Sequence, residues 1–223
     1  MKVFTQIDEL LGKKSFLDPR LKRLEERFIS VKTTFYSLDF VNDRRDSCDC
    51  IVCVPEGTLD LVVEDMEKME TLGQKIQDKA LLEKVSSALN QEKLLRDVLS
   101  ESEINSLKEY AFVTARPVVG YKGQDLLTLG SEIFDKSGVM FFFTAGKKES
   151  RAWLVNKNSD IVTASGKIHT DLARGFIRAE VFNIKDLDGF KNMEDAKQRG
   201  FLKIVERDYI VQDGDVITVK FSV

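Results

Sequence analysis

The sequence is poor in the residues on which most catalytic and metal sites are built. Its 223 residues include one His, one Trp, three Cys and three Pro. The single His would have to serve any Ser–His or Cys–His pair, and no partner base or orienting group can be named for it. We therefore predict no catalytic residues, no metal site and no cofactor.

Long apolar runs are also absent. No stretch approaches the about 20 consecutive apolar residues that a membrane-spanning helix requires. The segment Met1–Glu9 lacks the apolar centre of a signal peptide. We expect a cytoplasmic protein with no membrane partner. Its net charge of −3 and apolar fraction of 43% are typical of a chain with one large or two small domains.

All three cysteines lie in the short segment Cys48–Cys53. A structural zinc site usually needs two separated pairs of ligands, and no fourth Cys is present to complete them. We interpret Cys50–Val54 as a buried strand in which Cys behaves as a small apolar residue. A redox role for Cys48 is the alternative.

The sequence also lacks an intact phosphate-binding loop, in which two spaced glycines precede Lys and Ser or Thr. Gly12–Ser15 resembles the end of this motif, but Ile7 occupies the position of the first glycine. We expect no strand before it, so the motif is rejected. Asn156–Asp160 is one residue too long for a guanine-reading motif.

The hydrophobic pattern predicts helices first and short strands later. The first forty residues are predicted as helix, helix and strand, with Asp18 capping the second helix and a strand at Thr33–Val41. Between Leu59 and Tyr110 the pattern predicts two helices packed as a hairpin, with a break near Gln77–Asp78. Ser100–Glu103 is a capping box. A strand at 111–119, interrupted at Pro117, follows.

Beyond Gly138 the pattern predicts two strands, a helix and further strands, which is a β-grasp plan. The predicted strands are 139–144, 151–155, 175–182 and 216–223, and the helix is 161–169.

Three segments in this region are similar to a known family in their order and in their residues. They are Phe143–Trp153, Gly166–Val181 and Asp208–Val216, and they contain the only Trp and the only His. They resemble the C-terminal TGS domain of the YchF/Obg-like family of P-loop ATPases and GTPases. Upstream, Asp18–Leu21 and Lys32–Asn42 resemble the segments that follow the family's phosphate-binding loop.

The resemblance implies an α+β chain with a truncated α/β G-domain remnant, a helical hairpin and a C-terminal β-grasp TGS domain. The expected boundaries are 1–66 for the remnant, 67–107 for the hairpin, 108–138 for a return segment and 139–223 for the TGS domain. The chain starts, on this comparison, just after the place of the phosphate-binding loop.

The resemblance also bears on activity. Asp39 matches the family's Mg²⁺-linked Asp and is the only nucleotide-site residue retained. Asn42 stands where a glycine belongs, and Gly123 replaces the base-reading Asn. Because phosphoryl transfer depends on positioning and charge stabilisation, we predict a non-catalytic protein, not an enzyme.

The expected function is binding of RNA or the ribosome, or of a regulatory ligand, through the TGS domain. Cations suit phosphate backbones, and the candidate contacts are Lys147, Lys148, Arg151, Lys167, His169, Arg174 and Arg178. Alternatively, Arg174 and Arg178 pair with Asp171 and Glu180.

Other hypotheses stay open. The chain could bind ATP, GTP or ppGpp at a non-standard site, sense a small molecule against its β-grasp sheet, or act as an adaptor through the helical hairpin. A truncated sheet would expose a strand edge, so a homodimer or a rearranged sheet is also predicted.

Overall fold

The computed structural model describes residues 1–72 and 75–222, which fold into two compact units. The first unit comprises Met1–Lys14 and Ser37–Ser137, and the second comprises Ser15–Tyr36 and the chain from Gly138 onward. The α+β fold class is confirmed. The unit boundaries differ from the expected ones, because residues 15–36 pack with the C-terminal unit.

The first unit is built on a five-stranded sheet whose order is β2-β4-β1-β5-β6. Strand β1 is central and lies parallel to β4 and β5, and β5 is parallel to β6. The strands are β1 (Lys2–Thr5), β2 (Gly12–Phe16), β4 (Tyr36–Val41), β5 (Cys50–Cys53) and β6 (Val118–Gly120).

The first helix predicted from the sequence is wrong, because residues 2–5 and 12–16 are strands. A strand therefore does precede the Gly12-Lys13 run, contrary to our expectation. Val3 and Thr5 are fully buried between neighbouring strands. An alternation of only four residues is too short to reveal its period, so pairing in the sheet decides the conformation.

The single strand predicted at Thr33–Val41 is divided between two sheets. Strand β3 (Lys32–Thr34) pairs with β8 (Glu149–Asn156), whereas β4 pairs with β1. Both halves are rich in β-branched and aromatic residues, which suit any strand. Local sequence therefore predicts extended chain correctly but does not specify the partner.

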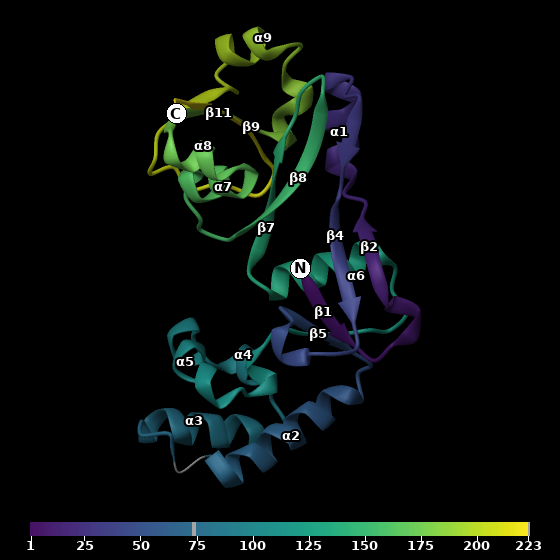
Figure 1. Cartoon of the computed structure of the whole chain (residues 1–223), viewed down its shortest axis with the longest axis vertical. Coiled ribbons are helices and arrows are strands. Elements are labelled where there is room, and N and C mark those ends of the chain that lie inside the picture. Colours follow the sequence, from purple (N-terminus) through teal and green to yellow (C-terminus); the bar gives the residue numbers. More distant parts are fainter. Residues whose placement is uncertain (73–74, 223) are drawn as a thin grey trace. The chain divides into compact units, whose positions relative to one another are not determined.

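The helical hairpin is present in the first unit, where Figure 1 shows α2, α3, α4 and α5 gathered together. Asp78 caps α3 by accepting from the amides of Ala80 and Leu81, and the predicted capping box of Ser100 and Glu103 is confirmed. The helices are α2 (Gly57–Leu72), α3 (Lys79–Asn90), α4 (Leu95–Val98) and α5 (Glu101–Ser106). Among the described residues, no helix is both long and apolar enough to cross a membrane.

A buried carboxylate joins the hairpin to the segment that leads into β6. Asp65 of α2 is fully buried and accepts from the amides of Val113 at 2.8 Å and Thr114 at 2.7 Å. The Thr114 hydroxyl donates to the same carboxylate at 2.6 Å. These bonds hold a 3₁₀ turn at Val113–Ala115, so the strand predicted at 111–119 is limited to β6.

The second unit contains a six-stranded sheet of order β10-β9-β11-β7-β8-β3. Strands β7 and β8 form an antiparallel hairpin, and β11 lies parallel to β7. The further strands are β7 (Val139–Thr144), β9 (Phe176–Asn183), β10 (Lys203–Val205) and β11 (Asp215–Phe221). The β-grasp plan predicted for this region is therefore present.

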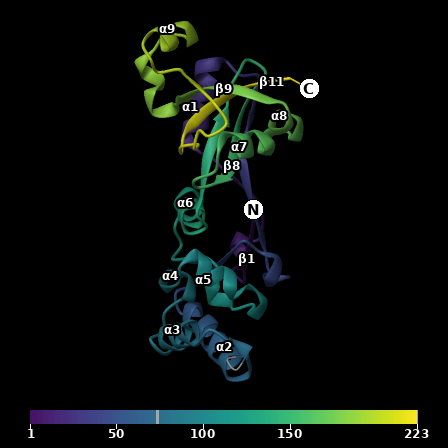
Figure 2. The same ribbon diagram turned by 90° about the vertical axis from the view of Figure 1, so that its left-hand side faces the viewer.

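Helices cover both faces of this second sheet. Figures 1 and 2 show α7 (Ile161–Ile168) and α8 (Thr170–Arg174) on one side of β8 and α1 (Pro19–Phe28) on the other. Under α1, the Phe16 and Phe141 rings stack at 5.6 Å, and the Arg20 guanidinium lies 5.2 Å from the centre of the Phe143 ring. The predicted Asp18 cap of α1 is confirmed.

Two further helices were not predicted from the sequence. They are α6 (Leu126–Lys136), in the first unit, and α9 (Met193–Gln198), in the second.

We expect Asp65→Ala to lower the free energy of unfolding by about 2 to 4 kcal/mol, because two amides and a hydroxyl lose their acceptor in the interior. Urea denaturation measures the loss. Glu67→Gln, on the exposed side of the same helix, is the control and should change stability little. Equal stability of both variants would show that the buried carboxylate does not hold this segment.

Gly175 is expected to tolerate no side chain, because a Cβ there would lie 2.0 Å from the backbone oxygen of Ser222. Gly175→Ala should therefore force the end of β11 away from the α8–β9 junction and lower the melting temperature by several degrees. Gly146→Ala is the control, because a Cβ at Gly146 meets no atom within 4 Å. A melting temperature unchanged by Gly175→Ala would contradict the close approach.

Candidate functional site

The carboxyl edge of the parallel strands is the place where sheets of this kind usually bind ligands. The loop after β1 contains a 3₁₀ turn at Asp8–Leu10. Its amides are used internally: Ile7 donates to the Thr5 hydroxyl at 3.2 Å, and Leu10 donates to the Ile7 carbonyl at 3.0 Å. The exposed carboxylates of Asp8 and Glu9 add negative charge. This loop therefore does not form a phosphate cradle.

Asp39, which the resemblance matches to the family's Mg²⁺-linked Asp, lies away from that edge. It is opposite Lys2 in the pairing of β4 with β1, three residues before the end of β1 at Thr5. At about 3.3 Å per residue, it lies about 10 Å from the loop. Asn42 follows the end of β4, and Gly123 has a positive φ of 82°. The structure does not bring Asp39 together with the loop after β1.

The cysteine segment forms the predicted strand, β5. Cys50 is fully buried, and desolvation raises the pKa of its thiol to about 12. Burial also raises the pKa of the Cys48 thiol, which disfavours the thiolate that redox chemistry requires. Within residues 1–72 and 75–222, no group of His, Cys, Asp and Glu is arranged to hold a metal ion.

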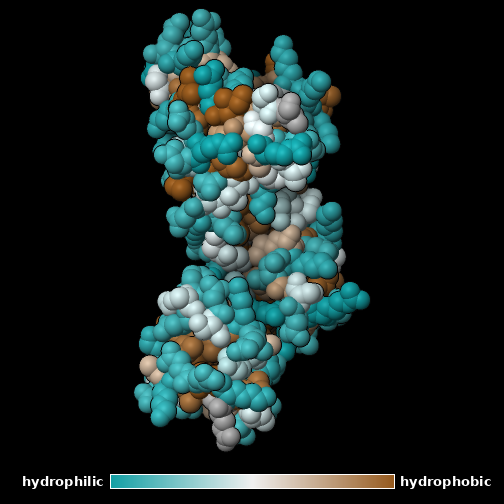
Figure 3. Space-filling model, turned by 60° about the vertical axis from the view of Figure 1, so that its left-hand side comes forward, coloured by the Kyte–Doolittle hydropathy of each residue, from teal (hydrophilic) through white to brown (hydrophobic). Residues whose placement is uncertain are grey.

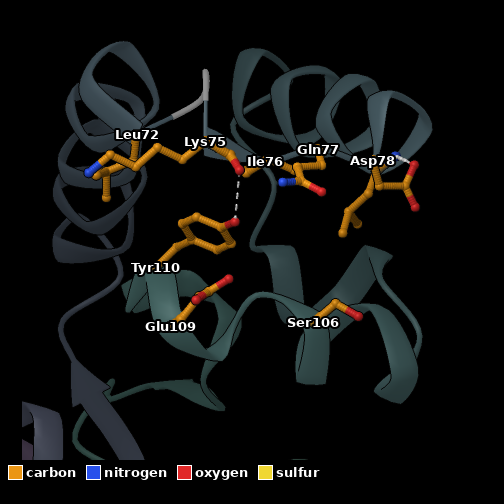
Figure 4. Close-up of a pocket in the computed structure, with 9 residues that line it drawn as sticks. Leu72, Lys75, Ile76, Gln77, Asp78, Ser106, Glu109 and Tyr110 are labelled. Atoms are coloured by element: carbon orange, nitrogen blue, oxygen red, sulfur yellow. Dashed lines mark hydrogen bonds between the residues drawn. The ribbon is translucent and has the colours of Figure 1, made fainter.

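A pocket of about 630 Å³ lies in the helical hairpin. Figure 4 shows Tyr110 beneath Lys75 and Ile76, and its hydroxyl donates to the Lys75 carbonyl at 3.1 Å. Asp78, Ser106 and Glu109 surround the opening, and Leu72, Ile76 and Leu81 supply apolar surface. The mixture of charges does not select one class of ligand.

The candidate cations of the second unit form two groups. Lys147 and Lys148 are exposed in the turn between β7 and β8. Arg151, on β8, lies 4.0 Å from the centre of the Trp153 ring, and the Trp153 indole N–H donates to the Thr144 hydroxyl at 3.0 Å. Residues 151, 153 and 155 share one face of β8, and Val155 packs in one core cluster with Ile161 of α7. Arg151 and Trp153 therefore lie on the face that α7 covers.

The second group follows along the chain from α7 to β9. Lys167, His169 and Arg174 are exposed. His169 is a local structural residue, since its Nδ1 accepts from the Asp171 amide at 3.2 Å and caps α8. Arg174 pairs with Asp171 at 3.0 Å, as the pairing alternative predicts.

Arg178 behaves differently from the rest. Glu180 pairs with Lys220 at 3.5 Å and not with Arg178, so this half of the pairing alternative is wrong. Arg178 lies opposite Lys220, and its neighbour Ala179 is buried in the core under α7. Adjacent residues of a strand point to opposite faces. Arg178 is therefore on the face away from α7. Lys220 lies on the same face, and it is a cation that was not among the predicted candidates.

The motif near the C-terminus is a structural turn. Asp215 is 2% exposed and accepts from the Tyr209 hydroxyl at 2.8 Å and the Gln212 amide at 2.9 Å. Asp213 accepts from the Phe141 amide at 3.1 Å, and Gly214 has a positive φ of 86°. These residues maintain the contact of β11 with β7. Their resemblance to a family therefore reflects a shared fold and does not indicate a ligand site.

Comparison with known proteins gives a consistent result. The family model YchF-GTPase_C, described as a protein of unknown function (DUF933), matches residues 139–222. The ribosome-binding ATPase YchF of Mycoplasma genitalium is 29% identical over 170 residues, which cover 73% of this chain and 45% of that protein. The YchF of Bacillus subtilis is 37% identical over 123 residues, covering 55% and 34%.

Similarity extends to an animal protein and to a solved structure. Obg-like ATPase 1 of Gallus gallus is 36% identical over 128 residues, covering 57% of this chain and 30% of that protein. The structure of the Schizosaccharomyces pombe YchF GTPase superposes with a TM-score of 0.78 over 99% of this chain and 97% of that chain, at 16% identity. The chain spans less than half the length of these curated relatives.

These findings correct one prediction. The relatives are named as ATPases and the structural neighbour as a GTPase, which points to an enzyme and contradicts the prediction that the chain is not one. The predicted loss of activity rested on missing motif residues alone. The resemblance itself is confirmed: the family model, the relatives and the solved structure that this chain matches all carry YchF or Obg-like names.

Proposed function

We propose that this chain acts at the ribosome, and that the second unit, as a TGS-type domain, contacts ribosomal RNA. The names of the YchF relatives support association with the ribosome. The observation that carries the RNA contact is a set of cations in the second unit, which lie on α7, on the α7 face of β8 and in the turn between β7 and β8. It combines Lys147, Lys148 and Lys167 with the Arg151–Trp153 stack.

The physical argument rests on available charge. The side chains of Lys147, Lys148 and Lys167 are exposed and have no ion-pair partner among the described residues. Each can therefore neutralise a phosphate and release its counterions. Trp153 is half-buried beneath Arg151, and an aromatic ring beside a guanidinium group suits stacking with an unpaired base. Figure 3 shows a largely hydrophilic surface from this side of the molecule, interrupted by apolar patches.

Ribosome co-sedimentation over a salt series tests the contact. Lys167→Glu combined with Arg151→Glu should weaken binding about tenfold or more and reduce the salt dependence, because phosphate contacts are lost. Arg178→Glu is the matched control, an exposed Arg on the opposite face of the same sheet, and should weaken binding much less. Binding that is indifferent to salt, or equally weakened by both changes, would contradict the proposed face.

ATP hydrolysis is a second candidate function, and the names of the relatives favour it. The strand order of the first unit, with β1 central among parallel strands, also suits nucleotide binding at the carboxyl edge. The loop after β1 uses its amides internally. A nucleotide would therefore be held by contacts other than a glycine-rich phosphate cradle, as the non-standard-site hypothesis requires.

Phosphate release from ATP, measured with and without ribosomes, tests this second function. We expect hydrolysis above that of a mock preparation, with stimulation by ribosomes if binding orders the loop after β1. Calorimetry with ATP, GTP and ppGpp would separate nucleotide binding from turnover. No binding and no phosphate release under either condition would contradict ATP hydrolysis but would leave ribosome binding to its own test.

A further inference from the structure

The free edge of β6 is an unused feature of the first unit. One side of β6 pairs with β5, where the Ile51 amide donates to the Pro117 carbonyl and the Tyr121 amide to the Cys53 carbonyl, at 2.9 and 2.7 Å. On its other side no strand pairs with it among residues 1–72 and 75–222. Backbone groups alternate between the two sides of a strand. The N–H groups of Val118 and Gly120 therefore point to the open side.

A hollow of about 340 Å³ runs along β6. All three residues of β6 line it, together with Thr58, Leu94, Glu132, Asp135 and Lys136. The hollow thus combines a strand's backbone with apolar and charged side chains. That combination suits an extended peptide, whose backbone bonds to the edge while alternate side chains enter the hollow.

The charges beside this edge are mainly negative. Glu132 and Asp135 of α6 are exposed. Lys136, the cation of the lining, is already paired with Asp97 at 2.8 Å. The Lys136 ammonium is therefore already neutralised, and among the described residues no cation pairs with the Glu132 carboxylate. A peptide that carries Lys or Arg would complement this charge, and an acidic peptide would be repelled.

Gln124 shows that the edge accepts an amide partner. Its side-chain N–H₂ group donates to the Gly120 carbonyl at 3.0 Å and to the Glu132 carboxylate at 3.1 Å. In a bound peptide, a backbone N–H would take the place of this amide at the Gly120 carbonyl. A cationic side chain would take its place at the Glu132 carboxylate. Displacement of the Gln124 side chain would open both acceptors.

We propose that the free edge of β6 is a docking site for an extended, Lys- or Arg-bearing segment of a partner protein, which adds to the sheet as a further strand. The Val118 and Gly120 amides supply the backbone donors, and Glu132 receives the cationic side chain. This assignment does not depend on the RNA contact of the second unit.

Gly120 permits a selective test. Its N–H points to the open edge, its φ is not positive and a Cβ there would meet no atom within 4 Å. Gly120→Pro removes the outward donor while leaving the bonds to β5, and Pro is tolerated at such edges. Gly120→Ala is the matched control, because it adds a side chain and keeps the donor.

The probe is a fluorescent peptide of about ten residues that alternates Val or Thr with Lys, a length that spans an ordinary strand. Fluorescence anisotropy should show saturable binding to the native chain and to Gly120→Ala. Gly120→Pro should weaken it about tenfold or more, a difference that lost backbone bonds can supply. Glu132→Lys should weaken it as well, and the same peptide with Glu in place of Lys should not bind.

Two results would overturn the proposal. One is that the native chain shows no saturable binding of the peptide, and the other is that Gly120→Pro binds the peptide as tightly as the native chain does. A dimer of this chain that Gly120→Pro dissociates would show that a second copy occupies the edge instead. If Gly120→Pro fails to fold, hydrogen exchange of the native chain decides: the Gly120 amide must become protected when the peptide is added, and an unprotected amide refutes the docking.

Discussion

The packing of residues 15–36 onto the second sheet is the interaction on which the arrangement of this chain depends. Arg20 bonds to Asp18 at 2.8 Å and to Asp213 at 2.6 Å while lying over the Phe143 ring. Burial opposes its charge, but the hydrogen bonds and charges of both aspartates outweigh that effect and raise its pKa. A cation held in this way fixes α1 against the turn that contains Asp213 and thereby closes the second face of the sheet.

This packing explains why the chain passes between sheets twice. Strand β2 leads out of the first sheet into α1, and the run from Lys32 to Val41 returns after contributing β3 to the second sheet. An αL residue, Ile29, ends α1 with a positive φ of 51°, and the Ser30 hydroxyl bonds to Ser150 at 2.8 Å. The N-terminal excursion is therefore part of the C-terminal unit's core and not a separate G-domain element.

The polar groups of the two units fall into two kinds: those whose hydrogen bonds hold the fold, and those that are exposed. Asp65, Asp213, Asp215 and His169 each satisfy backbone donors, so their chemistry is used in holding the fold. Lys147, Lys148 and Lys167 have exposed ammonium groups, and the outward groups of β6 face no other strand of the described chain. Sites for partners are expected where polar groups are available, and the two proposals use two such places on different units.

The sequence by itself determined the features that depend on local patterns. Asp18, Asp78 and the Ser100–Glu103 box cap helices as predicted, because an N-cap is defined by neighbouring residues. The β7 strand and the C-terminal plan were also predictable from alternation and turn residues. The segments that carry the resemblance contain Asp215 and Gly175, which are constrained by a buried turn and by a close backbone contact.

Only the tertiary structure decided which strands pair and which charges are available. Short strands such as β1 have no distinctive period, and β3 and β4 are equally suited to either sheet, so pairing over long sequence separations selects their partners. The partner of Glu180 is Lys220, forty residues away, and not nearby Arg178, because the pairing of β9 with β11 places Lys220 diagonally across from Glu180. The prediction that the chain is not an enzyme rested on motif residues alone, and the ATPase and GTPase names of the relatives and of the structural neighbour contradict it.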